Sequence, residues 1–344
     1  MNIAVLSGGY SPERDVSLTS GSLIANALID LGHRVCLCDA YLGIDINSED
    51  KEFLFNCEKK PLHKVENTVP DLDELKRKSG NGDALIGKGV IELCRMADAV
   101  FLALHGSMGE NGQLQAVLDS YGIKYTGSGY VGSLLAMDKD ISKRLLCESG
   151  IPTPEWMYIK AVDADVSEIE KKIGFPCVVK PCCCGSSVGV SIVEDCGELR
   201  NALDFAKKYE DYIIIEKKIN GRELTVGVLD GKVLPIIEII PTKGFYDYTN
   251  KYQAGKTQEV CPAQISENLR EKLGLLTLKA FDALRLSGYA RLDYIVDLEG
   301  ICWCLEANTL PGMTPTSLLP QMAAHIGMSY GELCFEIVKT ALKK

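Results

Sequence analysis

The first third of the chain alternates short apolar runs with helical patterns. The expected strands lie at residues 2–6, 34–39 and 97–104, and the expected helices at residues 16–31 and 112–121. Because strands that alternate with helices pair into parallel sheets covered by helices, this part predicts an α/β domain. Residues 49–82 are charged and interrupted by Pro and Gly, and we expect a variable insertion there.

A change of composition at Gly127-Ser128-Gly129 predicts the first domain boundary. Residues 132–150 have a helical pattern, which ends before Pro152 and Pro154. A smaller α+β segment follows, with strands expected at residues 156–159, 177–180, 188–193 and 212–217 and helices at 166–173 and 199–208. We therefore expect an N-terminal domain over residues 1–126 and a central domain over residues 127–217.

Residues 218–344 predict a third domain. The expected elements are strands at residues 224–228 and 233–240, a helix at 266–286, a hairpin of residues 289–296 and 301–307, and a terminal helix. The polar loop 241–260 is longer than a simple connection, and such loops are typical of lids over ligands.

Composition and charge narrow the classes of function. The 344 residues predict two or three domains, and the net charge of −10 argues against nucleic-acid and anionic-membrane partners, which need a basic face. No run approaches the roughly 20 apolar residues of a membrane span, and the start of the chain lacks the pattern of a signal peptide. We expect a cytoplasmic protein. Its 14 cysteines, none in a paired C-x-x-C pattern, are then reduced thiols rather than zinc ligands.

The predicted C-terminal hairpin carries the densest chemistry. Side chains alternate along a strand, so Arg291 and Asp293 share one face, as do Glu306 and Asn308. With a two-residue loop at 298–299 these faces coincide, and Arg291 opposes Glu306. Two carboxylates and an amide oxygen suit Mg²⁺. The alternative is a structural salt bridge between Arg291 and one of the two carboxylates.

Two further segments indicate nucleotide binding. Lys180 ends an apolar strand and precedes a small, Gly- and Ser-rich turn whose backbone N–H groups suit phosphates, although an ordinary hairpin explains the turn equally well. Glu216 and Lys217 end another strand, with Glu223 after a turn. They suit an adenine amino group and ribose hydroxyls; solvated charges at a strand end are the alternative.

Two loops follow predicted strands of the first domain, where α/β folds bind ligands. His105 opens the sequence His-Gly-Ser-Met-Gly-Glu-Asn-Gly, whose glycines allow close approach of a substrate. Gly8-Gly9 is followed by Glu13, a candidate for binding a substrate ammonium. Each loop alone is also explained as an ordinary turn.

Taken in order, these motifs resemble the D-alanine–D-alanine ligases of the ATP-grasp superfamily over nearly the whole chain. The matching stretches are Gly8-Gly-x-Ser-x-Glu13-x-x-Val-Ser17, His105-Gly-x-x-Gly-Glu-x-Gly112, Met137-Asp-Lys139, Lys180-Pro-x-x-x-Gly-Ser-Ser187, Glu216-Lys217 with Glu223, Tyr246-Asp-Tyr248-x-x-Lys251-Tyr252, and Arg291-x-Asp293 with Glu306-x-Asn-Thr-x-Pro-Gly312-Met-Thr-x-x-Ser317. The resemblance implies a Rossmann-like (pre-ATP-grasp) parallel sheet followed by a two-lobed ATP-grasp fold, with ATP between the central and C-terminal sheets. It also implies a homodimer.

The resemblance implies roles for individual residues. The nucleotide contacts would be Lys139, Lys180, Glu216, Lys217 and Glu223, and the Mg²⁺ (or Mn²⁺) ligands Asp293, Glu306 and Asn308. Arg291 and the N–H of Gly312 would hold an oxyanion. Glu13, linked to Ser186 and Tyr252, would bind the first D-alanine near His105, and Lys251 would neutralise phosphoryl charge. Ser317 and Leu318 match the site of the second D-alanine.

The resemblance also implies the reaction. One D-alanine carboxylate attacks the γ-phosphate of ATP, and the amine of a second D-alanine then displaces phosphate to give D-alanyl-D-alanine for peptidoglycan synthesis.

Cys184 and Thr316 depart from the common pattern, which has an acidic residue and a histidine at these positions. D-Alanine–D-serine and D-alanine–D-lactate ligases are therefore the alternatives within the family. Tyr252 favours an amine acceptor. Other ATP-grasp ligases lack the Gly8-Gly-x-Ser-x-Glu13 motif and the lid motif of residues 246–252, both of which are present here. A catalytically silent nucleotide-binding protein is a further alternative, but loss of Arg291 or of a metal ligand would be expected in it.

Overall fold

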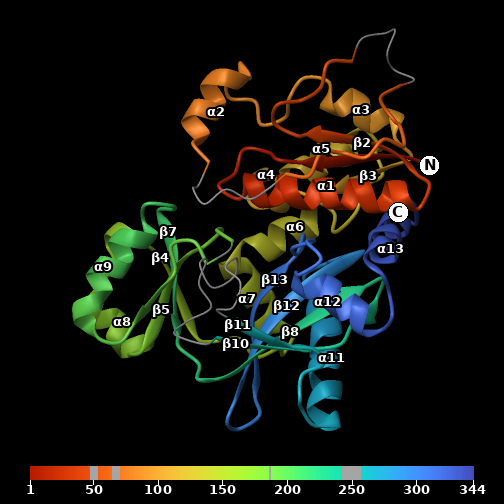
Figure 1. The fold of residues 1–344 in the computed structure, drawn as a ribbon. Helices are drawn as coiled ribbons and strands as arrows, with labels where there is room; N and C mark the ends of the chain where they lie inside the picture. The colour runs from red at the N-terminus through yellow and green to blue at the C-terminus, as the bar shows by residue number, and fades with distance from the viewer. Residues whose placement is uncertain (47–52, 64–69, 186, 242–256) are drawn as a thin grey trace.

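The N-terminal part folds around a parallel sheet. The computed structural model describes residues 1–46, 53–63, 70–185, 187–241 and 257–344. Strands β1 (Asn2–Ser7), β2 (Arg34–Asp39) and β3 (Ala99–Leu102) pair in the order β2-β1-β3, all parallel. The helices around them are α1 (Arg14–Asp30), α2 (Leu72–Ser79), α3 (Val90–Met96), α4 (Ser107–Glu110) and α5 (Gln113–Ser120) (Figure 1). The predicted α/β domain is confirmed, and the predicted insertion contains α2.

The central part is an antiparallel sheet with helices on its outer face (Figure 1). Its strands β4 (Trp156–Lys160), β5 (Cys177–Pro181), β6 (Ser191–Val193) and β7 (Tyr212–Lys217) pair in the order β4-β7-β5-β6. Helices α8 (Val166–Lys172) and α9 (Cys196–Ala206) cover that face. The helical stretch predicted at 132–150 is two helices, α6 (Tyr130–Met137) and α7 (Lys139–Glu148), because Asp138 ends the first and caps the second.

The C-terminal part contains a second antiparallel sheet. Its strands are β8 (Gly221–Leu229), β9 (Lys232–Val233), β10 (Ile237–Pro241), β11 (Thr257–Val260), β12 (Tyr289–Asp297) and β13 (Cys302–Asn308), in the order β11-β10-β8-β12-β13 with β9 beside β8. The helices are α11 (Glu267–Ala283), α12 (Leu318–His325) and α13 (Tyr330–Leu342). The strand predicted at 233–240 is interrupted at Pro235, and the predicted terminal helix is two helices.

The predicted register of the β12–β13 hairpin is wrong. Arg291 opposes Asn308, not Glu306, and Asp293 opposes Glu306. The loop is one residue longer than predicted: the N–H of Asp297 donates to the carbonyl of Ile301, and Gly300 has a left-handed φ of +77°. With this longer loop alone, Arg291 and Asp293 would lie on the opposite face of the hairpin from Glu306 and Asn308. A bulge between Cys304 and Glu306 inserts Leu305 and returns them to one face.

One apolar cluster ties the C-terminal helices to the N-terminal sheet. It contains Ile3 and Val5 of β1, Leu319 of α12, and Ile337 and Val338 of α13, all fully buried. Figure 1 shows α13 beside α1 at the boundary between the two parts. The start of α12 is therefore held close to the loops that follow β1 and β3. Within the described residues, no helix combines the length and apolar character needed to cross a membrane.

The packing of α6 yields a stability test with a matched control. A Cβ added at Gly132 of α6 would lie 2.5 Å from the carbonyl oxygen of Arg285, whereas one at Gly274 of α11 would lie 3.9 Å from Val233. We expect Gly132→Ala to lower the free energy of unfolding by about 1–3 kcal/mol through overpacking. Gly274→Ala should raise it by up to about 1 kcal/mol, since alanine favours helix. Urea unfolding measures the change in the free energy of unfolding for both variants. Equal changes of the same sign would contradict the close packing at Gly132.

Candidate active site

Two cavities meet beneath the N-terminal domain. The first, of about 450 Å³, lies between the loops of the N-terminal domain and the end of the β12–β13 hairpin. The second, of about 500 Å³, lies between the central and C-terminal sheets. Lys139, Cys184 and Glu306 line both cavities. A group transferred between ligands in the two cavities would pass these three residues.

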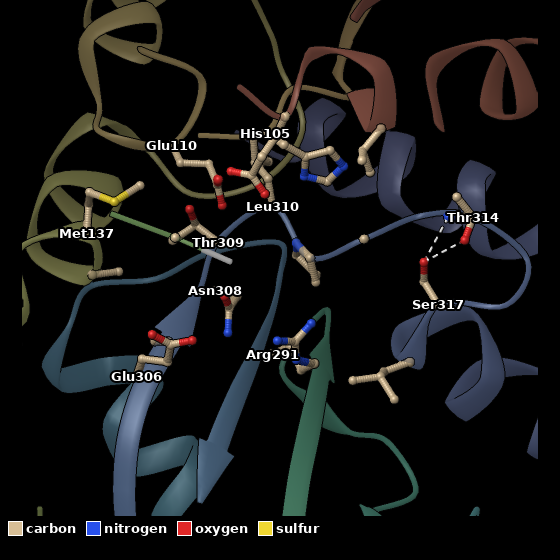
Figure 2. Close-up of a pocket in the computed structure, with 18 of the residues that line it drawn as sticks. His105, Glu110, Met137, Arg291, Glu306, Asn308, Thr309, Leu310, Thr314 and Ser317 are labelled. Atoms are coloured by element: carbon tan, nitrogen blue, oxygen red, sulfur yellow. Dashed lines mark hydrogen bonds between the residues drawn. The ribbon is translucent and has the colours of Figure 1, made fainter. Parts of the chain in front are cut away.

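The β12–β13 hairpin presents the floor of the first cavity. Figure 2 shows Arg291, Glu306 and Asn308 on one side, facing His105 and Glu110. The strands place them there because residues two apart share a face and the Leu305 bulge keeps both strands in phase.

Asp293 is the most heavily bonded group of this hairpin. Arg291 makes a two-pronged pair with it, with Nε 2.9 Å from Oδ1 and Nη2 2.8 Å from Oδ2. Thr225 Oγ1 donates to Oδ1 at 2.6 Å, and Asn308 Nδ2 donates to Oδ2 at 2.9 Å. The salt bridge considered as the alternative is therefore present, and the role of Asp293, Glu306 and Asn308 as metal ligands stays a prediction.

Lys139 stands between the two cavities. Asp138 caps α7 by accepting the N–H of Ile141, which places Lys139 at the first helical position. Its Nζ donates to the carbonyl of Cys184 at 2.6 Å and lies 3.9 Å from Glu306 Oε2. The side chain is 9% exposed. Lys139 therefore joins the loop after β5 to the carboxylates of the hairpin.

A buried triad lies at the second cavity, and two of its members, Lys180 and Glu216, line the cavity. Glu216 lies between Lys180, which forms a close ion pair with Oε1, and Lys143, 2.9 Å from Oε2. Burial alone would raise the pKa of Glu216, but the two lysines outweigh it and hold the pKa at about 2. Burial also lowers the pKa of Lys143, although Glu216 opposes this. Glu216 thus orients the predicted phosphate contact Lys180.

Lys143 was missed in the sequence. Its Nζ also donates to Thr153 Oγ1 at 2.7 Å and to the carbonyl of Pro154 at 2.9 Å. The available signal was its spacing of four from Lys139, which puts both lysines on one face of α7. Lys217 and Glu223, both predicted nucleotide contacts, line the second cavity with Lys180 and Glu216.

Glu13 and His105 face each other across the first cavity's inner end. Gly106, with φ +66°, lies so close to Glu13 that an added Cβ would be 2.9 Å from Glu13 Oε2. Burial lowers the pKa of His105, although Glu13 and a hydrogen bond to the carbonyl of Leu310 oppose this. His105 is therefore neutral at pH 7, and its buried Nε2 has no hydrogen-bond partner among the described residues.

Glu110, like Lys143, is a residue at the cavities for which the sequence predicted no role. It is half-buried and accepts the N–H of Gly106 at 2.5 Å. Burial and, to a lesser extent, Glu13 raise its pKa to about 8. Glu110 belongs to the His105 motif, but a motif alone does not indicate the raised pKa of this carboxyl group.

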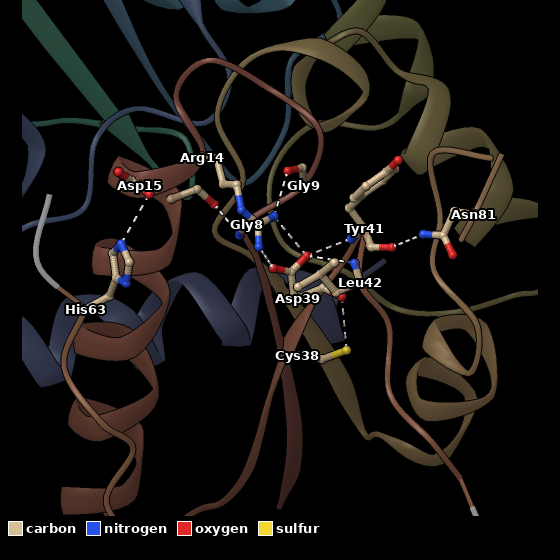
Figure 3. A network of polar contacts seen from close by, with 11 residues as sticks. Gly8, Gly9, Arg14, Asp15, Cys38, Asp39, Tyr41, Leu42, His63 and Asn81 are labelled. Carbon is tan, nitrogen blue, oxygen red and sulfur yellow. Dashed lines mark hydrogen bonds and ion pairs between the residues drawn. The ribbon is translucent and has the colours of Figure 1, made fainter. Parts of the chain in front are cut away.

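A network beneath Glu13 fixes the start of α1 (Figure 3). Arg14 pairs with Asp39 and donates to the carbonyl of Gly9 at 2.9 Å. Asp39 also accepts the N–H of Tyr41 at 2.9 Å. Gly8, with φ +72°, has no room for a side chain because a Cβ would lie 2.5 Å from Asp39. The Gly8-Gly9 turn is thus required for Glu13 to reach the cavity.

Ser317 and Leu318 line the flank of the first cavity. Ser317 precedes α12, and its Oγ accepts the N–H of Thr314 at 3.1 Å (Figure 2). Gly312 is adjacent, since an added Cβ there would lie 2.9 Å from Ser317 Oγ. A hydroxyl at a helix N-terminus suits a carboxylate. The predicted residues Ser186, Lys251 and Tyr252 lie outside the described residues.

Comparison with known proteins agrees with this geometry. Residues 2–128 match the model described as the D-ala D-ala ligase N-terminus, and residues 145–339 match that described as the D-ala D-ala ligase C-terminus. The chain belongs to the D-alanine–D-alanine ligase family. The predicted family is thereby confirmed, and with it an enzyme of the ATP-using ligase class.

Individual relatives of the D-alanine–D-alanine ligase family match along the whole chain. The D-alanine–D-alanine ligase of Pediococcus pentosaceus is 42% identical, with 98% of this chain and 97% of the relative covered. That of Lacticaseibacillus casei is 38% identical, with 100% and 96% covered. The crystal structure of the Bacillus anthracis ligase complexed with ATP has a TM-score of 0.75 and 32% identity, covering 100% of this chain and 97% of that one. The predicted ATP-grasp fold is confirmed.

The buried triad yields a prediction for this ligase-family chain. Lys143→Met leaves the buried Glu216 with one of its two cations, so we expect the free energy of unfolding to fall by about 3–5 kcal/mol. Lys172→Met is the matched control, because Lys172 pairs with Glu168 on an exposed helix face. It should change stability by less than about 0.5 kcal/mol. Urea unfolding measures both; an unaltered Lys143→Met midpoint would mean that the triad is not a stabilising unit.

Proposed function

We propose that this chain joins two molecules of D-alanine to D-alanyl-D-alanine, with cleavage of ATP to ADP and phosphate, and so supplies a peptidoglycan precursor. The observation that carries this is the junction of the two cavities at Lys139, Cys184 and Glu306. ATP occupies the cavity between the sheets, and its γ-phosphate reaches the junction. The first D-alanine occupies the other cavity with its carboxylate at the same point.

In the nucleotide cavity the lysines neutralise phosphate charge. Lys180 is oriented by Glu216, and Lys139 by the carbonyl of Cys184. Lys217 and Glu223 line the more distant part of the cavity and bind the nucleoside. Such fixed cations lower the barrier to phosphoryl transfer because they need no reorganisation as charge moves.

Asp293, Glu306 and Asn308 would hold Mg²⁺ (or Mn²⁺). Asp293 and Glu306 stand opposite each other in register, and Arg291 pairs with Asp293 while Lys139 is 3.9 Å from Glu306. Two carboxylates and an amide oxygen on one face are a hard-oxygen donor set that fits this ion. When bound, Mg²⁺ would neutralise charge on the phosphates.

In the first cavity Glu13 binds the ammonium of the first D-alanine, and the neutral His105 offers Nε2 as an acceptor beside it. The carboxylate oxygen attacks the γ-phosphorus to form D-alanyl phosphate and ADP. The second D-alanine then places its carboxylate at Ser317 and Leu318. Its amine attacks the acyl carbon, Arg291 and the N–H of Gly312 stabilise the oxyanion, and phosphate leaves.

The identity of the acceptor rests on the relatives as well. The most similar curated proteins carry the name D-alanine–D-alanine ligase, and the D-serine and D-lactate alternatives are not favoured. Thr316, the departure from the common pattern, lies beside this site with its Oγ1 3.2 Å from Thr314 Oγ1. We also propose the lid roles of Ser186, Lys251 and Tyr252, a homodimer and a cytoplasmic location, all from the family resemblance.

The reaction is tested by phosphate release with ATP, Mg²⁺ and D-alanine, and then with D-serine or D-lactate added as acceptor. D-Alanine alone should support turnover, and the added acceptors should not exceed it. Glu306→Gln, which keeps the size of the side chain but removes its charge, should lower kcat by more than about 100-fold. Circular dichroism should show an unchanged fold. A folded wild-type protein that releases no phosphate with D-alanine would refute the proposal, and an active Glu306→Gln would refute the role of Glu306.

A further inference from the structure

Three side chains beside the nucleotide cavity form a cluster that the ligase reaction does not use. They are Asp138, Cys182 and Cys183, whose ligand atoms all lie within 4.8 Å of one another. Among the described residues, this is the only such group of three His, Cys, Asp or Glu side chains. None of these three residues lines either cavity.

The cluster is anchored by its backbone. The N–H of Cys182 donates to the carbonyl of Tyr212 at 3.2 Å, and its carbonyl accepts the N–H of Lys139 at 3.3 Å. The Cys182 thiol donates to Asp138 Oδ1, with Sγ 3.4 Å from that oxygen. The N–H of Cys183 donates to Glu210 Oε2 at 2.7 Å. The two sulfurs and the carboxylate thus converge on one point from two fixed segments.

We propose that Asp138, Cys182 and Cys183 bind a thiophilic divalent cation of the Zn²⁺ or Cd²⁺ class, at a site separate from the predicted Mg²⁺ site. Two sulfurs and one carboxylate oxygen are donors that such ions prefer, whereas Mg²⁺ prefers an all-oxygen set. Metal–sulfur bonds of about 2.3 Å place two sulfurs within about 4.6 Å of each other, so only a small rotation of a thiol is needed.

The exposure of the three groups is compatible with entry of an ion. Cys183 is exposed, Asp138 is half-buried and Cys182 is buried. The ion enters from the Cys183 side and keeps water as its fourth ligand. Each coordinating thiol loses its proton to the solvent, so two metal–sulfur bonds form and two protons are released.

Binding at this site acts on Lys139. The carbonyls of Cys182 and Cys184 accept the Lys139 amino group at 3.4 and 2.6 Å. An ion that ties Cys182 and Cys183 to Asp138, the residue before Lys139, fixes the loop and the start of α7 together. Closing the three groups on an ion also shifts the carbonyls that hold the Lys139 amino group, so Lys139 leaves the position from which it assists phosphoryl transfer, and turnover slows.

The test is titration of the full-length protein with Cd²⁺ in saturating Mg²⁺ and a phosphine reductant, followed by the ultraviolet thiolate-to-cadmium band. The wild type should bind one Cd²⁺ tightly per chain. Cys183→Ser should weaken this binding by more than about tenfold, and Asp138→Asn should weaken it as well. Cys196→Ser, which removes another exposed thiol of the same lobe, is the matched control and should bind as the wild type does.

Two outcomes would overturn the proposal: an unchanged band in Cys183→Ser, or an equal loss in Cys196→Ser. The binding measurement does not depend on catalysis. A second readout is phosphate release with and without Cd²⁺. Inhibition should persist as Mg²⁺ is raised and should be absent in Cys183→Ser. Inhibition that Mg²⁺ relieves, or that Cys183→Ser retains, would place the ion at the Mg²⁺ site instead and contradict the effect on Lys139.

Discussion

The active site depends on two carboxylates held directly opposite each other on neighbouring strands. Asp293 and Glu306 form a register pair of β12 and β13, an arrangement that repels in the absence of cations. The surrounding residues supply the compensation: Arg291 and two hydrogen-bond donors surround Asp293, and Lys139 approaches Glu306. The remaining negative charge faces the junction of the two cavities, where the proposed reaction needs a cation.

Helix α7 links this charge to the proposed nucleotide cavity. Lys139 at its start reaches Glu306 and the loop after β5, and Lys143 one turn later reaches Glu216. Glu216 in turn orients Lys180. Helix α7 therefore has an ion pair with each sheet: Lys143 pairs with Glu216 of the central sheet, and Lys139 lies 3.9 Å from Glu306 of the C-terminal sheet. Burying such groups is costly unless each is paired, so Glu216 is satisfied only when Lys143 and Lys180 both hold their positions.

Much of the site could be predicted from the sequence because its residues lie in local patterns. Glycines beside Glu13 and His105, and alternation along β12 and β13, place side chains without knowledge of distant contacts. The hairpin register could not be predicted, because the extra loop residue and the Leu305 bulge each change the face and only together restore it. The role of Lys143 and the raised pKa of Glu110 could not be predicted either, since both result from contacts with segments distant in the chain.

The most direct test of the central claim follows an oxygen atom from one cavity to the other. D-Alanine labelled with ¹⁸O in its carboxylate is supplied with unlabelled ATP, and the released phosphate is examined by mass spectrometry. If the γ-phosphate is transferred across the junction to the D-alanine carboxylate, the phosphate carries one labelled oxygen from the amino acid. Phosphate whose new oxygen comes from solvent water would contradict the account.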